Sequence, residues 1–490
     1  MINSIQQFLE YGIANLQEAT QDYSKNPSDF AGFVYKVRDE ALKLALDYIS
    51  ETLNTCNQII KENPKRKAEW EVVRTDEKSL ITSIGVVRFQ KTLFRNKSTR
   101  TTRYLVDDLL GFRSHERLSE DAQAQLFKEC VQTSYRKAGE AVSILDKVSK
   151  QTVKEKIHAL KFPIEKPHRG RKRKVKYLYI EADEDHVSLQ FQNRKGDLEV
   201  SESGRKLNGM INKLVYVHEG IAPESPNSKR HKLINPHYFA GAYEGKANVE
   251  LWDEVYEYIE NNYDIDSIRR IYISADGGMW IKSGRKRISG LVYALDGYHL
   301  EQCILKMTGH MLDCAEEARE MIYEAIKNGT RDDFISVTDK LLFYALDIKE
   351  EKRIIESRDY ILDNWSAAKV RMTDRSAVGS STEGHVYHVL SSRMSTLAMG
   401  WSRKGADKMA RLRAYRYNRN DMLQLVRYQR EALPKAAGAE ETADLVSEVR
   451  RTQHSHPEWG KYVDAMQAEI SSEMKKWMSI GLHSNIWTLF

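Results

Sequence analysis

Two aspartates stand where carboxylates could meet and hold metal ions. Asp183 ends the apolar run 177–182, and Asp276 ends a second run, 270–275. Each run has the composition of a buried strand, and carboxylates at the ends of neighbouring strands would meet at one rim of a sheet. Oxygen ligands of this kind suit Mg²⁺. Two such ions can activate one oxygen and stabilise another during phosphodiester chemistry, so we expect two Mg²⁺, with Mn²⁺ able to substitute.

A third carboxylate, Glu383, follows the sequence Gly-Ser-Ser-Thr at 379–382. Ser381 or Thr382 can cap a helix there, and a glutamate in the first turn is favoured by the helix dipole. Glu383 shares one face of that helix with three other residues, Tyr387, Leu390 and Met394. We therefore expect this helix to pack on the sheet and to complete a metal site of Asp183, Asp276 and Glu383.

Two other acids lie on the first strand. Asp185 is two positions beyond Asp183 and so shares its face, which leaves it as an alternative for the first metal ligand. Glu181 is expected either on an outer face or behind the ligands, in support of them.

The elements that must position these acids follow one another in a recognisable order. Strands are indicated near 177–183, 187–192, 210–218 and 270–276, with an amphipathic helix at 248–262 before the last of them. An RNase H-like core has three consecutive strands, then a crossover helix and a fourth strand. In this core the first and fourth strands are neighbours. We expect such an α/β catalytic domain over 177–400, with a helical insertion over about 300–370.

The fold class expected for the whole chain is multidomain α+β. The other regions are an N-terminal helical region (1–70), a small β module with Gly85 as a possible bulge (71–116), a helix-turn-helix-like region (117–165), a basic linker (166–176) and a C-terminal basic and helical region (401–490). The length of 490 residues fits several domains.

Two of these regions could hold double-stranded DNA. Ala138, Val142 and Leu145 indicate one helix and Ser149 caps a second, whose Lys150 and Gln151 would meet base edges, although a plain helical hairpin explains the pattern equally well. In the linker, seven of eleven residues are Lys or Arg. We expect it to lie along phosphates, or else to be merely solvated. Its candidate DNA contacts are Arg169, Arg171, Lys172, Arg173 and Lys174.

Further cations and aromatic residues follow the third acid. Arg393 is expected on the DNA backbone or simply on the surface. Arg411 and Arg413 belong to the stretch 403–419, which interleaves basic and aromatic residues and fits either a DNA clamp or a solvated basic helix. Trp280 and Trp401 could stack on a base, but tryptophans of this kind are more often part of a core.

Composition limits the other possibilities. The net charge of +6 is compatible with a nucleic-acid partner. No apolar run approaches the roughly 18 residues of a membrane span, and the N-terminus lacks the pattern of a signal peptide. Four cysteines without CxxC spacing indicate neither a disulfide framework nor a zinc site. We expect a cytoplasmic, nucleoid-associated protein with no membrane partner.

The motifs around the acids resemble those of bacterial insertion-sequence transposases of the Mutator-like DDE group. The resemblance rests on the Asp–Asp–Glu order, on ISADGG around Asp276 and on GSSTEGHV around Glu383. It favours Asp183 over Asp185 as the first acid. It also implies that His299, in Asp296-Gly-Tyr-His, lies near the active site and steers DNA or the scissile phosphate; without it, these two residues would be a turn at a strand end.

The expected function is therefore that of a DNA transposase. It would bind terminal inverted repeats, hydrolyse the phosphodiester bond at the element end, and transfer the freed 3′-hydroxyl to target DNA, as a homo-oligomer at synapsis. Two alternatives remain open. One is a transposase-derived DNA-binding protein without activity, and the other is a host RNase H-like nuclease that cuts without joining.

Overall fold

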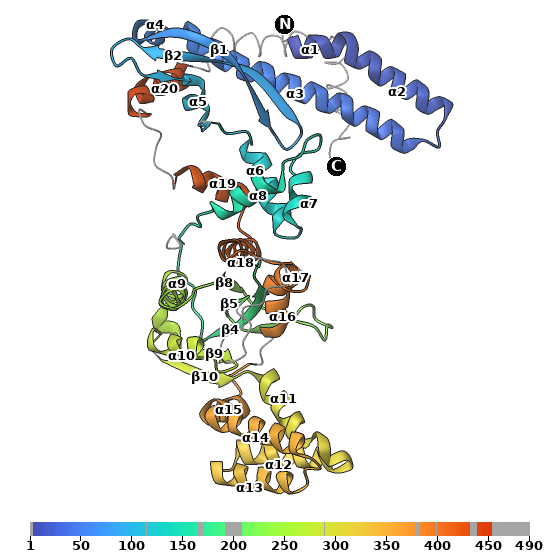
Figure 1. Cartoon of the computed structure of the whole chain (residues 1–490), viewed down its shortest axis with the longest axis vertical. Helices are drawn as coiled ribbons and strands as arrows, with labels where there is room; N and C mark the ends of the chain where they lie inside the picture. The colour runs from blue at the N-terminus through green and yellow to red at the C-terminus, as the bar shows by residue number, and fades with distance from the viewer. Residues whose placement is uncertain are drawn as a thin grey trace. The chain divides into compact units, whose positions relative to one another are not determined.

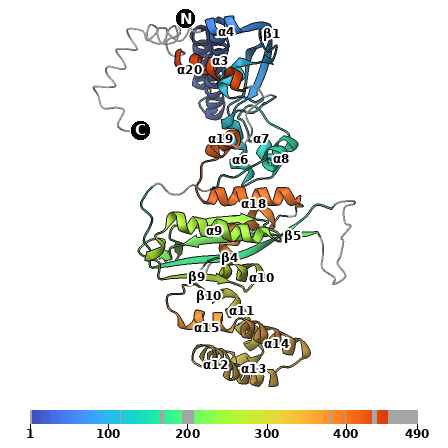
Figure 2. The same ribbon diagram turned by 90° about the vertical axis from the view of Figure 1, so that its left-hand side faces the viewer.

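The computed structural model describes residues 3–113, 115–164, 170–191, 208–288, 290–378, 382–397, 399–431 and 439–452. The chain divides into two compact units (Figures 1 and 2). The first comprises residues 1–129, 134–153 and 426–490, and the second comprises residues 130–133 and 154–425. Among the described residues, no helix combines the length and apolar character needed to cross a membrane.

The first unit builds its core from both ends of the chain. Its N-terminal part consists of α1 (Asn3–Gln7), a π-helical turn η1 (Phe8–Gly12), α2 (Ile13–Lys25), α3 (Phe30–Glu62), α4 (Pro64–Glu69), β1 (Trp70–Ile81), β2 (Val86–Asn96), β3 (Thr102–Arg103) and α5 (Leu105–Leu110). Trp70 and Phe94 are fully buried against α3. Leu445 and Val449 of α20 (Ala439–Thr452) join the same cluster. A late segment of the chain therefore completes the N-terminal core.

The β module is an antiparallel sheet of β1, β2 and β3. Gly85 lies in the turn between β1 and β2, where its carbonyl accepts from the Thr82 backbone N–H. The irregularity in the β1–β2 register falls instead between Val72 and Arg74. The expectation that Gly85 forms a bulge was therefore wrong, because the tight turn already accounts for this glycine.

Short helices follow the β module: α6 (Glu120–Cys130), α7 (Tyr135–Glu140) and α8 (Lys150–His158). Ser149 accepts a hydrogen bond from the Thr152 backbone N–H at 3.1 Å, so the predicted N-cap is confirmed. The preceding helix is shorter than its apolar stripe suggested. It ends at Glu140, and Leu145 is exposed.

The second unit is built on a five-stranded sheet. Its strands are β4 (Tyr177–Ser188), β5 (Gly209–His218), β8 (His237–Gly241), β9 (Arg270–Ala275) and β10 (Leu291–Leu295). Their order across the sheet is β10-β9-β4-β5-β8, with β4–β5 and β5–β8 antiparallel and β4–β9 and β9–β10 parallel. β4, the first of these five strands along the chain, is thus the central strand of the sheet. A small two-stranded sheet, β6 (Ile221–Pro223) with β7 (His231–Leu233), follows β5.

Helices cover both faces of this sheet (Figure 1). Alternate residues of β4, such as Leu178 and Ile180, pack in one cluster with Trp252 and Val255 of α9 (Ala247–Asn262). The opposite face meets α16 (Thr382–Val386), the π-helical turn η5 (Tyr387–Ser391) and α17 (Ser392–Met394). Two longer helices follow, α18 (Arg403–Tyr417), which packs against β8, and α19 (Met422–Glu431).

Short elements connect β8, β9 and β10. They are η2 (Ile265–Ser267), α10 (Met279–Lys282) and η3 (Ser283–Lys286).

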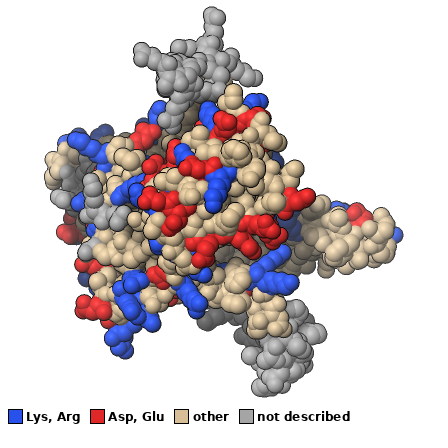
Figure 3. All heavy atoms as spheres, turned by 90° about the horizontal axis from the view of Figure 1, so that it is seen from below, with Lys and Arg blue, Asp and Glu red and all other residues tan. Residues whose placement is uncertain are grey.

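A helical insertion separates β10 from α16. It consists of α11 (Gly297–Thr308), η4 (Gly309–Cys314), α12 (Ala315–Lys327), α13 (Arg331–Phe343), α14 (Ile348–Asp363) and α15 (Trp365–Thr373), around a core that includes Ile322 and Phe334. The sequence had indicated helix over about 300–370. Figure 3 views the molecule from the side on which Figure 1 draws this insertion and shows acidic and basic side chains mixed with uncharged surface.

Candidate active site

Asp183 and Asp276 come to the same level of the sheet. In the parallel pair β4–β9, Ala182 lies opposite Ala275, so the residues that follow them are neighbours across the two strands. Leu295 of β10 also pairs with Ala275 and is followed by Asp296. At this level β9 and β10 end and are followed by Asp276 and Asp296, whereas Asp183 lies within β4, which runs on to Ser188. The expectation of a separate strand near 187–192 was therefore wrong.

The charge of Asp183 is perturbed by its surroundings. Burial raises the pKa of this carboxyl to about 7, against the opposing effect of the Glu184 backbone N–H, which donates to Asp183 Oδ1 at 2.8 Å. The negative charges of Asp276 and Glu383 also raise this pKa, whereas His299 lowers it. Asp276, Glu383 and His299 therefore all lie within electrostatic range of Asp183, although they come from the end of β9, α16 and α11.

A glycine turn positions Asp276. Its Oδ1 accepts from the Gly278 backbone N–H at 3.0 Å, and its backbone carbonyl accepts from the Tyr360 hydroxyl at 2.7 Å. Gly277 has φ +95°, and a Cβ at this position would lie 2.9 Å from Asn364 Oδ1. Only glycine fits at position 277 without strain, which explains the first of the two glycines after Asp276.

Asp296 orients His299. The Asp296 side chain caps α11 by accepting from the His299 backbone N–H at 3.2 Å, and its Oδ2 lies 2.9 Å from His299 Nδ1. The hydrogen bond to Asp296 raises the pKa of His299, and the charges of Asp183 and Asp276 raise it further. Because Nδ1 is engaged with Asp296, Nε2 is the ring nitrogen left for a substrate.

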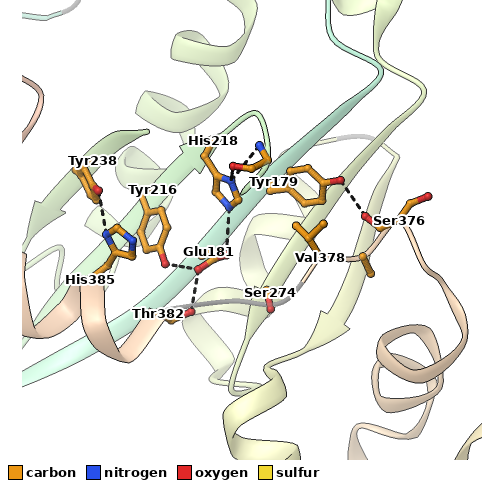
Figure 4. Close-up of polar contacts among 12 residues, drawn as sticks. Tyr179, Glu181, Tyr216, His218, Tyr238, Ser274, Ser376, Val378, Thr382 and His385 are labelled. Atoms are coloured by element: carbon orange, nitrogen blue, oxygen red, sulfur yellow. Dashed lines mark hydrogen bonds and ion pairs between the residues drawn. The ribbon is translucent and has the colours of Figure 1, made fainter. Parts of the chain in front are cut away.

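Glu383 is exposed in the first turn of α16, next to the buried Thr382, and Tyr387 is exposed as well. The expectation that these two residues pack on the sheet together with Leu390 and Met394 was therefore wrong. Thr382 Oγ1 donates to Glu181 Oε2 at 3.1 Å (Figure 4). Glu181 is only 1% exposed and also contacts the Tyr216 hydroxyl and, at 3.1 Å, His218 Nε2. Of the two positions that the sequence left open for Glu181, the outer face was therefore wrong.

Sequence patterns did not predict that Arg371 of α15 would connect several elements of the site by hydrogen bonds. Its guanidinium donates to Ser274 Oγ at 2.6 Å, to the Leu295 carbonyl at 2.8 Å and to the Val378 carbonyl at 2.6 Å. Arg371 thus links β9 and the end of β10 with the segment that precedes α16. Its partners are mostly backbone carbonyls, which every residue has, so no residue type or spacing could reveal them.

The acids do not form a closed metal cage. Among the described residues, no group of three or more His, Cys, Asp or Glu side chains is close enough to hold a metal ion. The arrangement is a pair of aspartates on adjacent strands, with a histidine and an exposed glutamate within electrostatic range.

Comparison with known proteins places the chain in a family. The model of the uncharacterised protein family UPF0236 matches residues 24–431. This chain belongs to that family. A UPF0236 protein of Caldanaerobacter subterraneus subsp. tengcongensis is 34% identical over 402 residues, which cover 82% of this chain and 81% of the relative. A UPF0236 protein in the vanSb 3′ region of Streptococcus gallolyticus is 22% identical over 427 residues, covering 84% and 88% of the two chains.

Two arginines that were predicted to contact DNA are buried in this UPF0236 chain. Arg393 is 4% exposed, donates to the Cys130 carbonyl at 3.2 Å and lies over the Trp401 ring at 4.9 Å. Arg413 is also 4% exposed and donates to the carbonyls of Val131, His388 and Val389. The prediction of a surface position was wrong for both, because these guanidinium groups satisfy buried backbone carbonyls.

Other predicted DNA contacts have protein partners. Arg411 donates to Asp407 at 3.1 Å and to the Tyr243 hydroxyl at 3.0 Å. Arg173 donates to Glu219 at 2.6 Å, and the exposed Lys174 lies 3.6 Å from Asp264. The remaining candidates differ in where they lie. Lys150, Gln151, Arg171 and Lys172 are exposed, and Arg169 lies outside the described residues.

The two tryptophans pack within the protein. Trp401 is buried and its indole N–H donates to the Met394 carbonyl at 2.9 Å. Trp280 packs against the α9 side of the sheet and donates to Glu184 Oε2 at 2.8 Å. Both side chains thus contribute to packing, which was the more probable of their two interpretations.

Proposed function

We propose that this protein is a Mg²⁺-dependent DNA transposase that acts through Asp183, Asp276 and Glu383. The observation that carries the proposal is the register of β4 and β9, which puts Asp183 of β4 beside Asp276, the residue that follows the end of β9. The strand order β10-β9-β4-β5-β8, with the first strand central, supports an RNase H-like core. The helical insertion between His299 and Glu383 agrees with the resemblance to Mutator-like DDE transposases.

The acidic residues fit magnesium by their chemistry. All three are hard oxygen donors. The pKa of Asp183 is raised to about 7, chiefly by burial and in part by the charges of Asp276 and Glu383, and a divalent cation would stabilise the ionised carboxylate. Glu383 is exposed and next to the buried Thr382, so a side-chain rotation could bring its carboxylate inward. When bound, two Mg²⁺ or Mn²⁺ ions would supply Lewis-acid activation and charge stabilisation at the scissile phosphate.

The other residues of the site act on the substrate and on the carboxylates. His299, held by Asp296, presents Nε2 toward a DNA phosphate and, when protonated, offsets its charge. Tyr360 and Gly278 fix Asp276 from its backbone and side-chain ends. Exposed Lys150, Gln151, Arg171 and Lys172 are the described candidates for holding double-stranded DNA, at terminal inverted repeats and at the target.

The names of the relatives add independent support. The name of the first Caldanaerobacter relative joins eleven locus designations, and that of another relative from the same organism joins four. One protein with many loci in one organism is what repeated copies of a mobile element would produce. Synapsis of two element ends would also require a homo-oligomer.

A plasmid assay tests the proposal. A supercoiled plasmid that carries the gene with its natural flanking DNA is incubated with the full chain and Mg²⁺. We expect breaks at the element ends with free 3′-hydroxyls, followed by joining to target DNA. Asp276→Asn and Glu383→Gln should abolish the breaks while gel-shift binding to the same DNA remains.

Each alternative has its own outcome in this assay. Breaks made by either variant at the wild-type rate would refute the assignment of the three acids. Binding by the wild type without breaks in Mg²⁺ or Mn²⁺ would indicate an inactive DNA-binding protein. Breaks that are never followed by joining would indicate a nuclease.

A further inference from the structure

Strand β4 carries three acids on one face, at alternate positions. Glu181, Asp183 and Asp185 are two residues apart and therefore point to the same side of the sheet. The outer two are buried, with 1% of Glu181 and 6% of Asp185 exposed, whereas Asp183 between them is half-buried. Burying a carboxylate is costly unless hydrogen bonds compensate it, so the partners of the outer two need an explanation.

Both outer acids bond to the helical segment that carries Glu383. Glu181 accepts from Thr382 Oγ1 at 3.1 Å, one residue before Glu383. Asp185 Oδ1 accepts from Ser391 Oγ at 2.8 Å and from Ser395 Oγ at 2.7 Å, beyond Glu383 in the chain. Glu383 therefore lies between two hydrogen-bonded attachments to the strand that carries Asp183.

The π-helical turn η5 helps to bring both attachments to one side. Thr382 and Ser391 are nine residues apart, which in a regular α-helix separates their directions by roughly 180°. The extra residue of a π turn reduces this angle to roughly 80°. The turn Tyr387–Ser391 lies between the two attachments, so both hydroxyl groups can face β4.

Further bonds hold Glu181 and α16 in place. Burial keeps the pKa of Tyr216 well above its usual value, so its hydroxyl remains a donor to Glu181. His218 Nε2 lies on the other carboxylate oxygen at 3.1 Å. On α16 itself, His385 Nδ1 lies 2.9 Å from the Tyr238 hydroxyl of β8 (Figure 4).

We propose that Glu181 and Asp185 are positioning residues that fix the Glu383 helix to β4 through Thr382, Ser391 and Ser395. This inference rests on the proposed function, because it assigns the attachments the task of holding Glu383 near Asp183 for metal binding. Neither acid is a metal ligand in this arrangement. Packing of Val386, Val389 and Leu390 can hold the helix against the sheet, and the hydroxyl–carboxylate bonds tie its rotation and its position directly to β4.

The test removes hydroxyl groups without removing bulk. Thr382→Val and the double variant Ser391→Ala/Ser395→Ala remove one attachment each. Thr396→Val is the matched control, because its exposed hydroxyl donates to the Ser391 carbonyl within its own segment. Thr382→Ser retains the hydroxyl and should rescue. All variants are made in the full chain and are checked for cooperative unfolding, with a lower melting temperature expected where a buried carboxylate loses its donor.

Two measurements are made on each variant. Mn²⁺ binding without DNA is followed by electron paramagnetic resonance, and we expect about 10-fold weaker binding for Thr382→Val and for the double serine variant. Thr382→Ser and Thr396→Val should stay within about 2-fold of the wild type. Amide exchange of residues 382–394 should be faster in the first two variants only.

The outcomes separate this inference from the proposed function. Wild-type Mn²⁺ affinity and unchanged exchange in Thr382→Val and in the serine variant would overturn the positioning role. Loss of Mn²⁺ affinity in these variants, with no DNA breaks by the wild type, would support the positioning role and reject the transposase. If the wild type bound no Mn²⁺, the amide exchange alone would decide: faster exchange supports the attachments, and unchanged exchange overturns them.

Discussion

Replacing Asp183 with asparagine should stabilise the metal-free protein at alkaline pH. The pKa of Asp183 is about 7 in the folded chain, against an ordinary value of 3.8 for an aspartate side chain. Between these two pH values the folded state keeps a proton that the unfolded state releases, so the free energy of unfolding falls as pH rises. Above pH 7 the Asp183 carboxyl is ionised in both states, and the full free-energy cost of burying its charge in the folded state remains. An asparagine side chain never ionises and so avoids this cost.

The difference in pKa sets the size of the effect. About three pKa units correspond to about 4 kcal/mol at 1.36 kcal/mol per unit. Because Asp183 is partly open to solvent, we expect roughly half of this. At 2–4 °C per kcal/mol for a domain of comparable size, Asp183→Asn should raise the melting temperature by roughly 4–8 °C at pH 8.

Thermal unfolding in EDTA between pH 5 and pH 8 measures this. The gain over the wild type should grow from pH 5 to about pH 7 and then stay constant. Added Mg²⁺ should raise the melting temperature of the wild type more than that of the variant, because the variant lacks a ligand. Asp266→Asn, at an exposed position in η2, should change little and serves as the control. A variant that is no more stable than the wild type at pH 8, or a gain independent of pH, would refute the electrostatic account of the site.

Two further predictions concern the histidine and the arginines. Asp296→Asn removes the hydrogen bond that raises the pKa of His299, so the loss of DNA cleavage on the alkaline side should move to lower pH; an unmoved pH profile would exclude protonated His299 from the reaction. Arg413→Met should lower the free energy of unfolding by roughly 2 kcal/mol or more, because buried carbonyls lose their donor, while the salt dependence of DNA binding stays unchanged. The double variant Arg171→Ala/Lys172→Ala should show the reverse, with unchanged stability and a log–log salt slope reduced by about 2.

Much of the fold could be predicted because its signals are local. The strands at 177 and 270 are continuous apolar runs, and the structure has β4 and β9 there. The helices between β10 and α16 likewise follow from apolar residues at helical spacing. The boundary of α7 was missed because the periodic stripe continues to Leu145 while the helix ends at Glu140.

Contacts between segments that are distant in the sequence could not be predicted from such local patterns. Arg393 and Arg413 looked like surface cations because their neighbours are polar and basic. Their partners are the carbonyls of Cys130 and Val131, more than 250 positions earlier in the chain. The use of α20 to complete the N-terminal core is equally invisible, since Leu445 and Val449 fit any amphipathic helix.

The three acids of β4 show why residue type alone could not assign roles on this strand. Sequence spacing placed Asp183 and Asp185 on one face and offered no physical reason to prefer either. The structure separates them by their partners, since Asp185 accepts from two serine hydroxyls and Asp183 only from a backbone N–H. Asp185 Oδ1 already accepts two bonds from the helical segment, so a cation at that oxygen would cost those bonds, while the buried Oδ2 accepts none. The half-buried acid whose pKa is raised to about 7 gains most from a cation, so Asp183 is the member of this face suited to hold one.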